Sequence, residues 1–282
     1  MNEFGIASNK QFVLWNWVGG RYSIWSSVGL TLAVIIGWEH FESFLAGAHE
    51  MDEHFLEAPI DKNLPVLLAL IGVWNRNFLE IGNHAVLPYY HRLRFLPTYL
   101  QQLEMESNGK STRRNGEPVQ CDTCPIIWGN LGSNAQHSFY QLLYQGTDKV
   151  SIDFFLPVLS GVKRPEHHDV LTANCLAHSW GLAEGYSESA GSSPHRHCPG
   201  DVPSSLILFE KLDPATLGSL IALYEHKVYV QGLIWDVNSF DQWGVQLGKR
   251  LAIGMEGILS DKSAIGPQAL EATLAQLRKW KA

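Results

Sequence analysis

Residues 152–159 read IDFFLPVL, a short and mainly apolar run that predicts a buried β-strand. A helix is predicted after it, over residues 168–183, and the same alternation of strand and helix recurs along the chain. Strands that alternate with helices over short loops favour parallel pairing through right-handed crossovers. The sequence therefore predicts an α/β fold, a three-layer α/β/α sandwich with a mainly parallel sheet.

The other elements follow from the same patterns of apolar spacing. Further strands are predicted over residues 12–17, 85–89, 125–128 and 205–209. Helices are predicted over residues 24–37, 41–56, 63–79, 95–105, 135–144, 214–229, 247–259 and 267–280. Asn63 is expected to cap the helix that it opens, with Pro65 in the first turn. Residues 187–203 are rich in Gly, Ser and Pro and are expected to form a surface loop.

Composition narrows the class of protein. The 282 residues are 45% apolar and 17% charged, which excludes a disordered chain. The net charge of −7 gives no global electrostatic signal for nucleic-acid binding. The longest apolar runs, residues 28–38 and 65–74, are shorter than the ~18–20 residues of a membrane helix, and no secretory signal is apparent. We therefore expect a soluble, cytoplasmic protein with neither a membrane nor a nucleic-acid partner.

The cysteines are too few for a disulfide scaffold, so the alternative to weigh is metal binding. Cys121 and Cys124 form a C-x-x-C pair, and His195, His197 and Cys198 form a second cluster. Zinc sites use such ligands, but an apolar strand is predicted directly after Cys124 and the two clusters lie far apart in the sequence. Unpaired thiols are the favoured interpretation, and no metal is expected.

Two segments carry residues suited to acid–base chemistry. In WVGGRYS, residues 17–23, Arg21 follows two glycines at the end of a predicted strand, where ligands bind in α/β sheets. In LEMESNGK, residues 103–110, Glu106 lies where an apolar helix ends, and Gln102 lies four residues earlier on the same face. A partly desolvated carboxylate is a candidate general base. A surface arginine and an ordinary solvated glutamate stay open as alternatives.

Two further segments add a histidine and a lysine. His137 lies in WGNLGSNAQHSFYQ, residues 128–141, in the first turn of a predicted helix, whose N-terminus favours neutral imidazole. Gln242 and Lys249 belong to a stretch over residues 224–249 that is unusually rich in polar residues and tryptophan for a core segment. A structural histidine and a surface lysine are the open alternatives to functional roles.

Two motifs extend well beyond these residues, NWVGGRYSIWSSVG over residues 16–29 and GLIWDVNSFDQWGVQLGK over residues 232–249. With the intervening AGAHEMDEHF, NLPVLLALIGVWNRNF and YLQQLEMESNGKS, they resemble the C-terminal half of the phosphoglucose isomerase family over nearly the whole chain. The resemblance implies a sugar isomerase (SIS) fold. Residues 1–80 would then hold the C-terminal part of a first SIS domain and connecting helices, residues 81–255 a second SIS domain, and residues 256–282 a helical tail.

The resemblance also implies a reaction, the interconversion of glucose 6-phosphate and fructose 6-phosphate in glycolysis and gluconeogenesis, without a cofactor. Glu106 would be the catalytic base. His137, contributed across a homodimer, would open the sugar ring together with Lys249. The residues that contact substrate would be Arg21, Gln102 and Gln242.

This chemistry suits the residue types. One carboxylate can take the proton from carbon 2 and return it to carbon 1, and a fixed arginine can meet the charge of the enediolate. The chain departs from the family pattern at WGNLGSNAQH and PGDVPS, and no Ser/Thr-rich phosphate loop precedes GGRYS. We therefore expect a partial enzyme. The alternative is a catalytically inactive SIS-fold module for sugar-phosphate binding or assembly.

Overall fold

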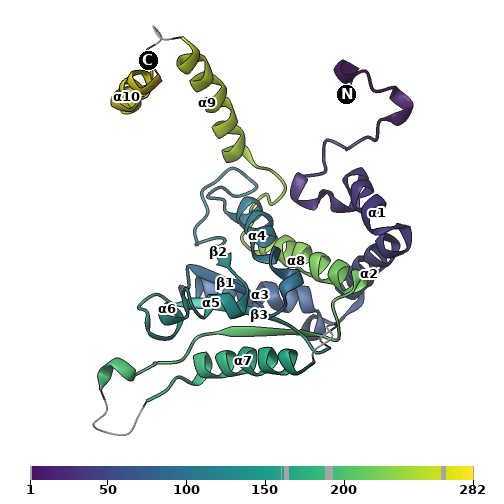
Figure 1. Cartoon of the computed structure of the whole chain (residues 1–282), viewed down its shortest axis with the longest axis vertical. Coiled ribbons are helices and arrows are strands. Elements are labelled where there is room, and N and C mark those ends of the chain that lie inside the picture. Colours follow the sequence, from purple (N-terminus) through teal and green to yellow (C-terminus); the bar gives the residue numbers. More distant parts are fainter. Residues whose placement is uncertain (1, 160, 162–164, 188–192, 262–264, 282) are drawn as a thin grey trace. The chain divides into compact units, whose positions relative to one another are not determined.

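The computed structural model describes residues 2–159, 161, 165–187, 193–261 and 265–281. The chain divides into two compact units, Met1–Phe240 and Asp241–Ala282 (Figure 1). Within the described residues, no helix combines the length and the apolar character needed to cross a membrane. The domain boundaries at residues 80 and 255 that the resemblance implies stay a prediction.

The first unit contains a four-stranded parallel sheet with the strand order β2-β1-β3-β4. The strands are β1 Asn83–Pro88, β2 Ile126–Gly129, β3 Val150–Pro157 and β4 Ser204–Phe209. In their register, Asn83 lies opposite both Ile126 and Val150, and Ile152 lies opposite Ser204. Every residue of β3 is buried, as expected for an interior strand of a parallel sheet. The predicted α/β fold with a mainly parallel sheet is confirmed.

Helices alternate with these strands and extend the chain on either side. In the first unit the α-helices are α1 Leu30–Ile36, α2 Trp38–Glu57, α3 Leu64–Asn77, α4 Leu96–Leu100, α5 Gly132–Ala135, α6 Tyr140–Gln145, α7 Pro165–Glu184 and α8 Pro214–Ile234. The second unit contains α9 Trp243–Ser260 and α10 Glu271–Lys281. A π-helix, η7, spans Gln101–Glu106. The 3-10 helices are η1 Asn2–Phe4, η2 Ser8–Lys10, η3 Gly20–Trp25, η4 Ser27–Gly29, η5 Ile60–Lys62, η6 His91–Leu93, η8 Pro194–Arg196 and η9 Gln268–Leu270.

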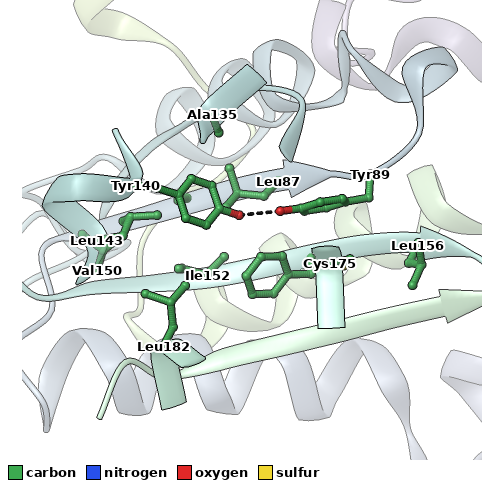
Figure 2. Packing of buried hydrophobic residues seen from close by; sticks show 12 residues of the cluster. Leu87, Tyr89, Ala135, Tyr140, Leu143, Val150, Ile152, Leu156, Cys175 and Leu182 are labelled. Atoms are coloured by element: carbon green, nitrogen blue, oxygen red, sulfur yellow. Dashed lines mark hydrogen bonds between the residues drawn. The ribbon is translucent and has the colours of Figure 1, made fainter. Parts of the chain in front are cut away.

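Successive residues of β1 face opposite sides of the sheet, as the two-residue period of a strand requires. Ala85 and Leu87 join a cluster with α5, α6 and α7, whereas Val86 joins a cluster with α4, η7 and α8. Figure 2 shows the first cluster, in which the hydroxyl groups of Tyr89 and Tyr140 meet at 2.7 Å within the core. Helices thus cover both faces of the sheet, and the predicted three layers are confirmed.

Capping side chains set the start of two long helices. Asn63 Oδ1 accepts a hydrogen bond from the Val66 backbone N–H at 3.3 Å, ahead of α3. Asp213 Oδ1 accepts from the Thr216 N–H at 2.9 Å, ahead of α8. Each helix also has proline in its first turn, where the missing N–H is not needed. The predicted cap at Asn63 is confirmed.

Helices α2 and α8 approach closely through two glycines. A Cβ atom on Gly47 would lie 1.9 Å from the carbonyl oxygen of Ala215, and one on Gly218 would lie 2.0 Å from the carbonyl oxygen of Phe44. Any other residue at these positions would force the two backbones apart. This contact fixes α2, which precedes the sheet in the sequence, onto a helix that follows all four strands.

The strand predicted over residues 12–17 is wrong. Among the described residues, no strand pairs with this segment, and Trp15 and Trp17 are 57% and 78% exposed. A strand needs a neighbour to satisfy its backbone N–H and C=O groups, and apolar character alone does not supply one. The helix predicted over residues 24–37 is also shorter than expected, because η3 and η4 occupy its first part.

The helix predicted over residues 135–144 is interrupted by a turn at residues 136–139. Ala135 and Tyr140 both enter the cluster of Figure 2, although they lie five residues apart. A continuous α-helix would place that spacing on different faces. His137 therefore lies in the turn between α5 and α6, and its predicted place in the first turn of a helix is wrong. The predicted loop over residues 187–203 lies partly outside the described residues, and its described part contains η8.

Candidate active site

Three segments that are distant in the sequence meet around the guanidinium group of Arg21, a residue of η3. Its Nε donates to Ser107 Oγ at 2.7 Å, its Nη1 to Glu106 Oε2 at 3.1 Å and its Nη2 to the Ser239 carbonyl oxygen at 2.6 Å. The side chain of Arg21 is 1% exposed and that of Glu106 is 17% exposed. Bonds in three directions hold the guanidinium group in one orientation, beside a carboxylate that solvent can reach.

Gln102 and Glu106 belong to the π-helix η7 and contact each other. Gln102 Nε2 donates to Glu106 Oε2 at 3.3 Å, so the same carboxylate oxygen receives Gln102 and Arg21. The sequence predicted that these two residues share a helix face, and the structure agrees. It differs in the type of helix, because residues 101–106 are not α-helical. π-Helical turns are rare and concentrate at functional sites.

Ser107 connects Arg21 to a second side chain of η3. Its Oγ lies 2.8 Å from the hydroxyl group of Tyr22. Burial raises the pKa of Tyr22, which keeps this phenol in its neutral, hydrogen-bonding form. The residue that directly follows Glu106 therefore helps to hold the cation that Glu106 contacts.

Residues 238–239, which precede α9, are hydrogen-bonded to residues 108–110, shortly after Glu106. Ser239 Oγ donates to Asn108 Oδ1 at 2.6 Å, and Lys110 Nζ donates to the Asn238 carbonyl oxygen at 2.7 Å. Asn108 and Ser239 are both buried. These bonds keep the Ser239 carbonyl oxygen in place as an acceptor for Arg21.

The structure brings together Arg21, Gln102 and Glu106 out of the six predicted site residues. His137 is exposed in the turn between α5 and α6. Gln242 and Lys249 belong to the second unit, where Gln242 is the N-cap residue of α9 and Lys249 is an exposed residue of that helix. The roles assigned to all six side chains stay predictions.

Cys121 with Cys124, and His195 and His197 with Cys198, are the two clusters whose side chains are of metal-binding types. In the part of the chain that the structure describes, no group of three or more His, Cys, Asp or Glu side chains could hold a metal ion. The four cysteines are free thiols. Burial raises the pKa of the Cys124 thiol and raises that of Cys175 to about 12. Burial thus disfavours the thiolate form of both side chains, which is the form that binds metals.

Several residues of this site were missed by the sequence analysis. Ser107 and Ser239 lie within two of the motifs that carry the resemblance, YLQQLEMESNGKS and GLIWDVNSFDQWGVQLGK, but their own spacing does not single them out. Glu104 and Lys227, which lie outside the site and are described below, were missed as well. Glu104 lies between the apolar residues Leu103 and Met105, which indicates burial, whereas Lys227 directly follows Glu225 and His226 and has no such signal.

Glu225 of α8 is a half-buried carboxyl group beside η3. It accepts hydrogen bonds from Trp25 Nε1 at 2.7 Å and from the Tyr99 hydroxyl at 3.3 Å. Burial raises the pKa of Glu225 from 4.5 to about 7, although both donors favour the charged form. The folded protein therefore keeps a proton that the unfolded chain loses between about pH 4.5 and 7.

The free energy of unfolding should consequently fall as pH rises through this window, because ionisation is harder in the folded state. Glu225→Gln replaces the carboxyl group with a neutral amide. At pH 8 it should raise the free energy of unfolding by on the order of 1–3 kcal/mol, with little change near pH 4.5. Urea unfolding at both pH values measures this difference, with exposed Glu210→Gln as the control. An equal effect of Glu225→Gln at both pH values would contradict the prediction.

The sequence of this chain is similar to those of known proteins over most of its length. The phosphoglucose isomerase family model matches residues 1–271. The chain is 52% identical to a glucose-6-phosphate isomerase of Chlorobium luteolum, covering 89% of this chain and 48% of that protein. It is 50% identical to one of Methylocella silvestris, with coverage of 97% and 53%. The chain therefore spans about half the length of these relatives.

A solved structure supports the same grouping. The glucose-6-phosphate isomerase of Chlamydia trachomatis superposes with a TM-score of 0.84 and is 42% identical in sequence. The match covers 95% of this chain and 52% of that one. At this identity, the likeness extends beyond the fold to the sequence itself.

Proposed function

Because the chain belongs to the phosphoglucose isomerase family, we propose that it supplies the acid–base centre of an enzyme that interconverts glucose 6-phosphate and fructose 6-phosphate. The observation that carries this proposal is the contact of Arg21 and Gln102 with one carboxylate oxygen of Glu106. It combines a base, a fixed cation and an amide at a single point.

Glu106 is the proton carrier in this proposal. Its carboxylate takes the proton from carbon 2 of the open-chain aldose, which leaves an enediolate. It then returns the proton to carbon 1 while the hydroxyl proton passes from O2 to O1, which gives the ketose. The electron pair of the broken C–H bond stays on the substrate, so no external oxidant or reductant is needed. A carboxylate of 17% exposure can meet substrate and still be partly screened from water.

Arg21 stabilises the charge that develops on the enediolate oxygens. A cation held by Ser107 and the Ser239 carbonyl needs little rearrangement when this charge appears, and preorganisation of this kind lowers a barrier effectively. Gln102 orients the carboxylate and contacts the substrate. These roles are supported by the geometry of the three side chains.

Ring opening moves a proton from O1 to O5 of the sugar before isomerisation begins. We assign this step to His137, contributed by the second subunit of a homodimer, and to Lys249, with Gln242 as a further substrate contact. The exposed position of His137 suits a residue that acts across an interface. The enzyme would act in glycolysis and gluconeogenesis in the cytoplasm.

The experiment that tests the function combines this chain with the N-terminal half of the Chlorobium luteolum relative. We expect the mixture to convert fructose 6-phosphate to glucose 6-phosphate, followed by a coupled dehydrogenase. Each half alone should have negligible activity, because phosphate binding remote from the reacting carbons contributes much of the transition-state stabilisation. A folded complex of the two halves without turnover would favour an inactive SIS-fold module instead.

A further inference from the structure

A buried ion pair joins the π-helix that carries Glu106 to α8. Lys227 Nζ of α8 donates to both carboxylate oxygens of Glu104, at 2.9 Å each. The side chains of Lys227 and Glu104 are 4% and 1% exposed. Glu104 precedes Glu106 by two residues, so one short helix presents one carboxylate to the core and the other to the candidate site.

The ion pair continues into a second buried polar cluster. Lys227 Nζ lies 4.9 Å from the ring centre of Tyr224, whose hydroxyl donates to Asp153 Oδ2 at 2.7 Å. His84 Nε2 contacts the same oxygen at 3.1 Å. Although burial opposes the charged form, Glu104 and Asp153 raise the pKa of Lys227. Lys227 is therefore a charged group in the core, held by its hydrogen bonds to Glu104 and its contact with the Tyr224 ring.

A cavity of about 90 Å³ lies beside the ion pair and is lined by Lys227, Glu104 and the buried amides of Asn75 and Gln231. A polar cavity of this size can hold water. The cavity also leaves room for a different side chain at position 227. Lys227→Met therefore removes the positive charge, and Lys227→Arg keeps it, without overpacking the core.

The helix type of η7 determines the directions in which the Glu104 and Glu106 side chains extend. Neighbouring residues of an α-helix are rotated by about 100° from one another. If residues 101–106 relaxed into an α-helix, Glu104 and Glu106 could not both keep their present directions. A buried charge without its partner is strongly unfavourable, and the setting of register is a known use of buried ion pairs. Lys227 therefore favours the π-helical form over the α-helical one.

We propose that Glu104 and Lys227 are positioning residues that fix the π-helical register of residues 101–106 and so aim Glu106 at Arg21. The catalytic consequence rests on the proposed function, whereas the structural consequence does not. Neither residue touches the candidate site itself. The pair acts through the backbone of η7, on the orientation of the carboxylate at its end.

The structural consequence is measured on this chain without any assay of activity. The Nε–H of Arg21, bonded to Ser107 in the wild type, is followed by nitrogen-edited NMR, and its hydrogen-exchange rate reports how firmly the site is held. Lys227→Met should raise this rate at least about tenfold, because η7 loses the contact that selects its register. Lys227→Arg keeps the cation and should leave the rate near the wild-type value.

Two further variants separate positioning from stability. Glu104→Met combined with Lys227→Met removes both charges, so the core regains stability and the midpoint of thermal unfolding should return close to wild type. Exchange at Arg21 should nevertheless stay fast in this double variant. Tyr140→Phe, which removes the Tyr89 hydrogen bond on the opposite face of the sheet, should lower stability and leave exchange at Arg21 unchanged (Figure 2).

The catalytic consequence is measured on the mixture with the N-terminal half. Lys227→Met and the double variant should lower kcat about 10- to 100-fold with little change in KM, since a carboxylate displaced by about 1 Å loses rate rather than binding. If the wild-type mixture is inactive, the proposed function fails, and the exchange rates still decide the positioning role. Unchanged exchange in Lys227→Met, or recovery of both exchange and kcat in the double variant, would overturn the inference.

Discussion

Glu106→Gln is expected to abolish isomerisation by the mixture of this chain with the N-terminal half. A neutral amide cannot accept the proton bound to carbon 2, and the loss of a general base costs about 100- to 10,000-fold in kcat. The amide has nearly the shape of the carboxylate and can still contact Arg21 through its oxygen. Folding should therefore be preserved, and the midpoint of thermal unfolding should change by no more than a few degrees.

The direct measurement for Glu106→Gln is exchange of the hydrogen at carbon 2 with isotopically labelled water, because it reports proton abstraction before product is released. Glu117→Gln, an exposed glutamate in the loop that follows, is the matched control and should exchange at the wild-type rate. Exchange at that rate in Glu106→Gln would remove Glu106 from the role of base.

Arg21→Met should lower kcat about 100- to 1000-fold, the range observed when one preorganised donor to a developing oxyanion is removed. It should also destabilise the fold by about 1–3 kcal/mol, since the Ser239 carbonyl oxygen loses a buried partner. Arg21→Lys tests whether charge alone is sufficient. A single ammonium group cannot hold Ser107, Glu106 and Ser239 together, so most of the rate should stay lost.

Steady-state kinetics and urea unfolding separate the two effects of the Arg21 variants. Arg92→Lys, at an exposed position, is the control and should match wild type in both measurements. If Arg21→Lys kept the wild-type kcat, the directional bonds to the guanidinium group would have no catalytic importance. Activity would then depend only on positive charge near the substrate.

The sheet was predictable because its strands are short apolar runs that alternate with helical segments over short loops. That pattern was sufficient for β1, β2, β3 and β4, and the cap at Asn63 was predictable from its residue type and from Pro65 in the first turn. It failed at residues 12–17, where a run that is also mainly apolar has no strand beside it among the described residues. Apolar spacing indicates what must be buried, but pairing depends on segments that the local sequence does not specify.

The sequence predicted the acid–base residues of the candidate site, but not the residues that hold them in place. The sequence motifs selected Arg21, Gln102 and Glu106, which do meet in the structure. Spacing alone favoured an ordinary helix over residues 95–105, because the π-helical turn depends on the tertiary contact between Glu104 and Lys227. The hydrogen bonds that Arg21 donates to Ser107 Oγ and to the Ser239 carbonyl oxygen join residues far apart in the chain, so no local pattern predicts them.

The close contact between α2 and α8 also affects how the chain folds during synthesis. Gly47 and Ala215 meet in the folded protein, yet α8 leaves the ribosome only after the whole sheet has been made. At about 5–20 residues per second, α2 waits on the order of ten seconds for its partner. Throughout that interval the apolar cluster around Phe41 and Phe44 lacks the two side chains that α8 contributes, Leu217 and Ile221. Conditions that slow translation would lengthen this interval, so the yield of folded chain should depend on elongation rate more than its final stability suggests.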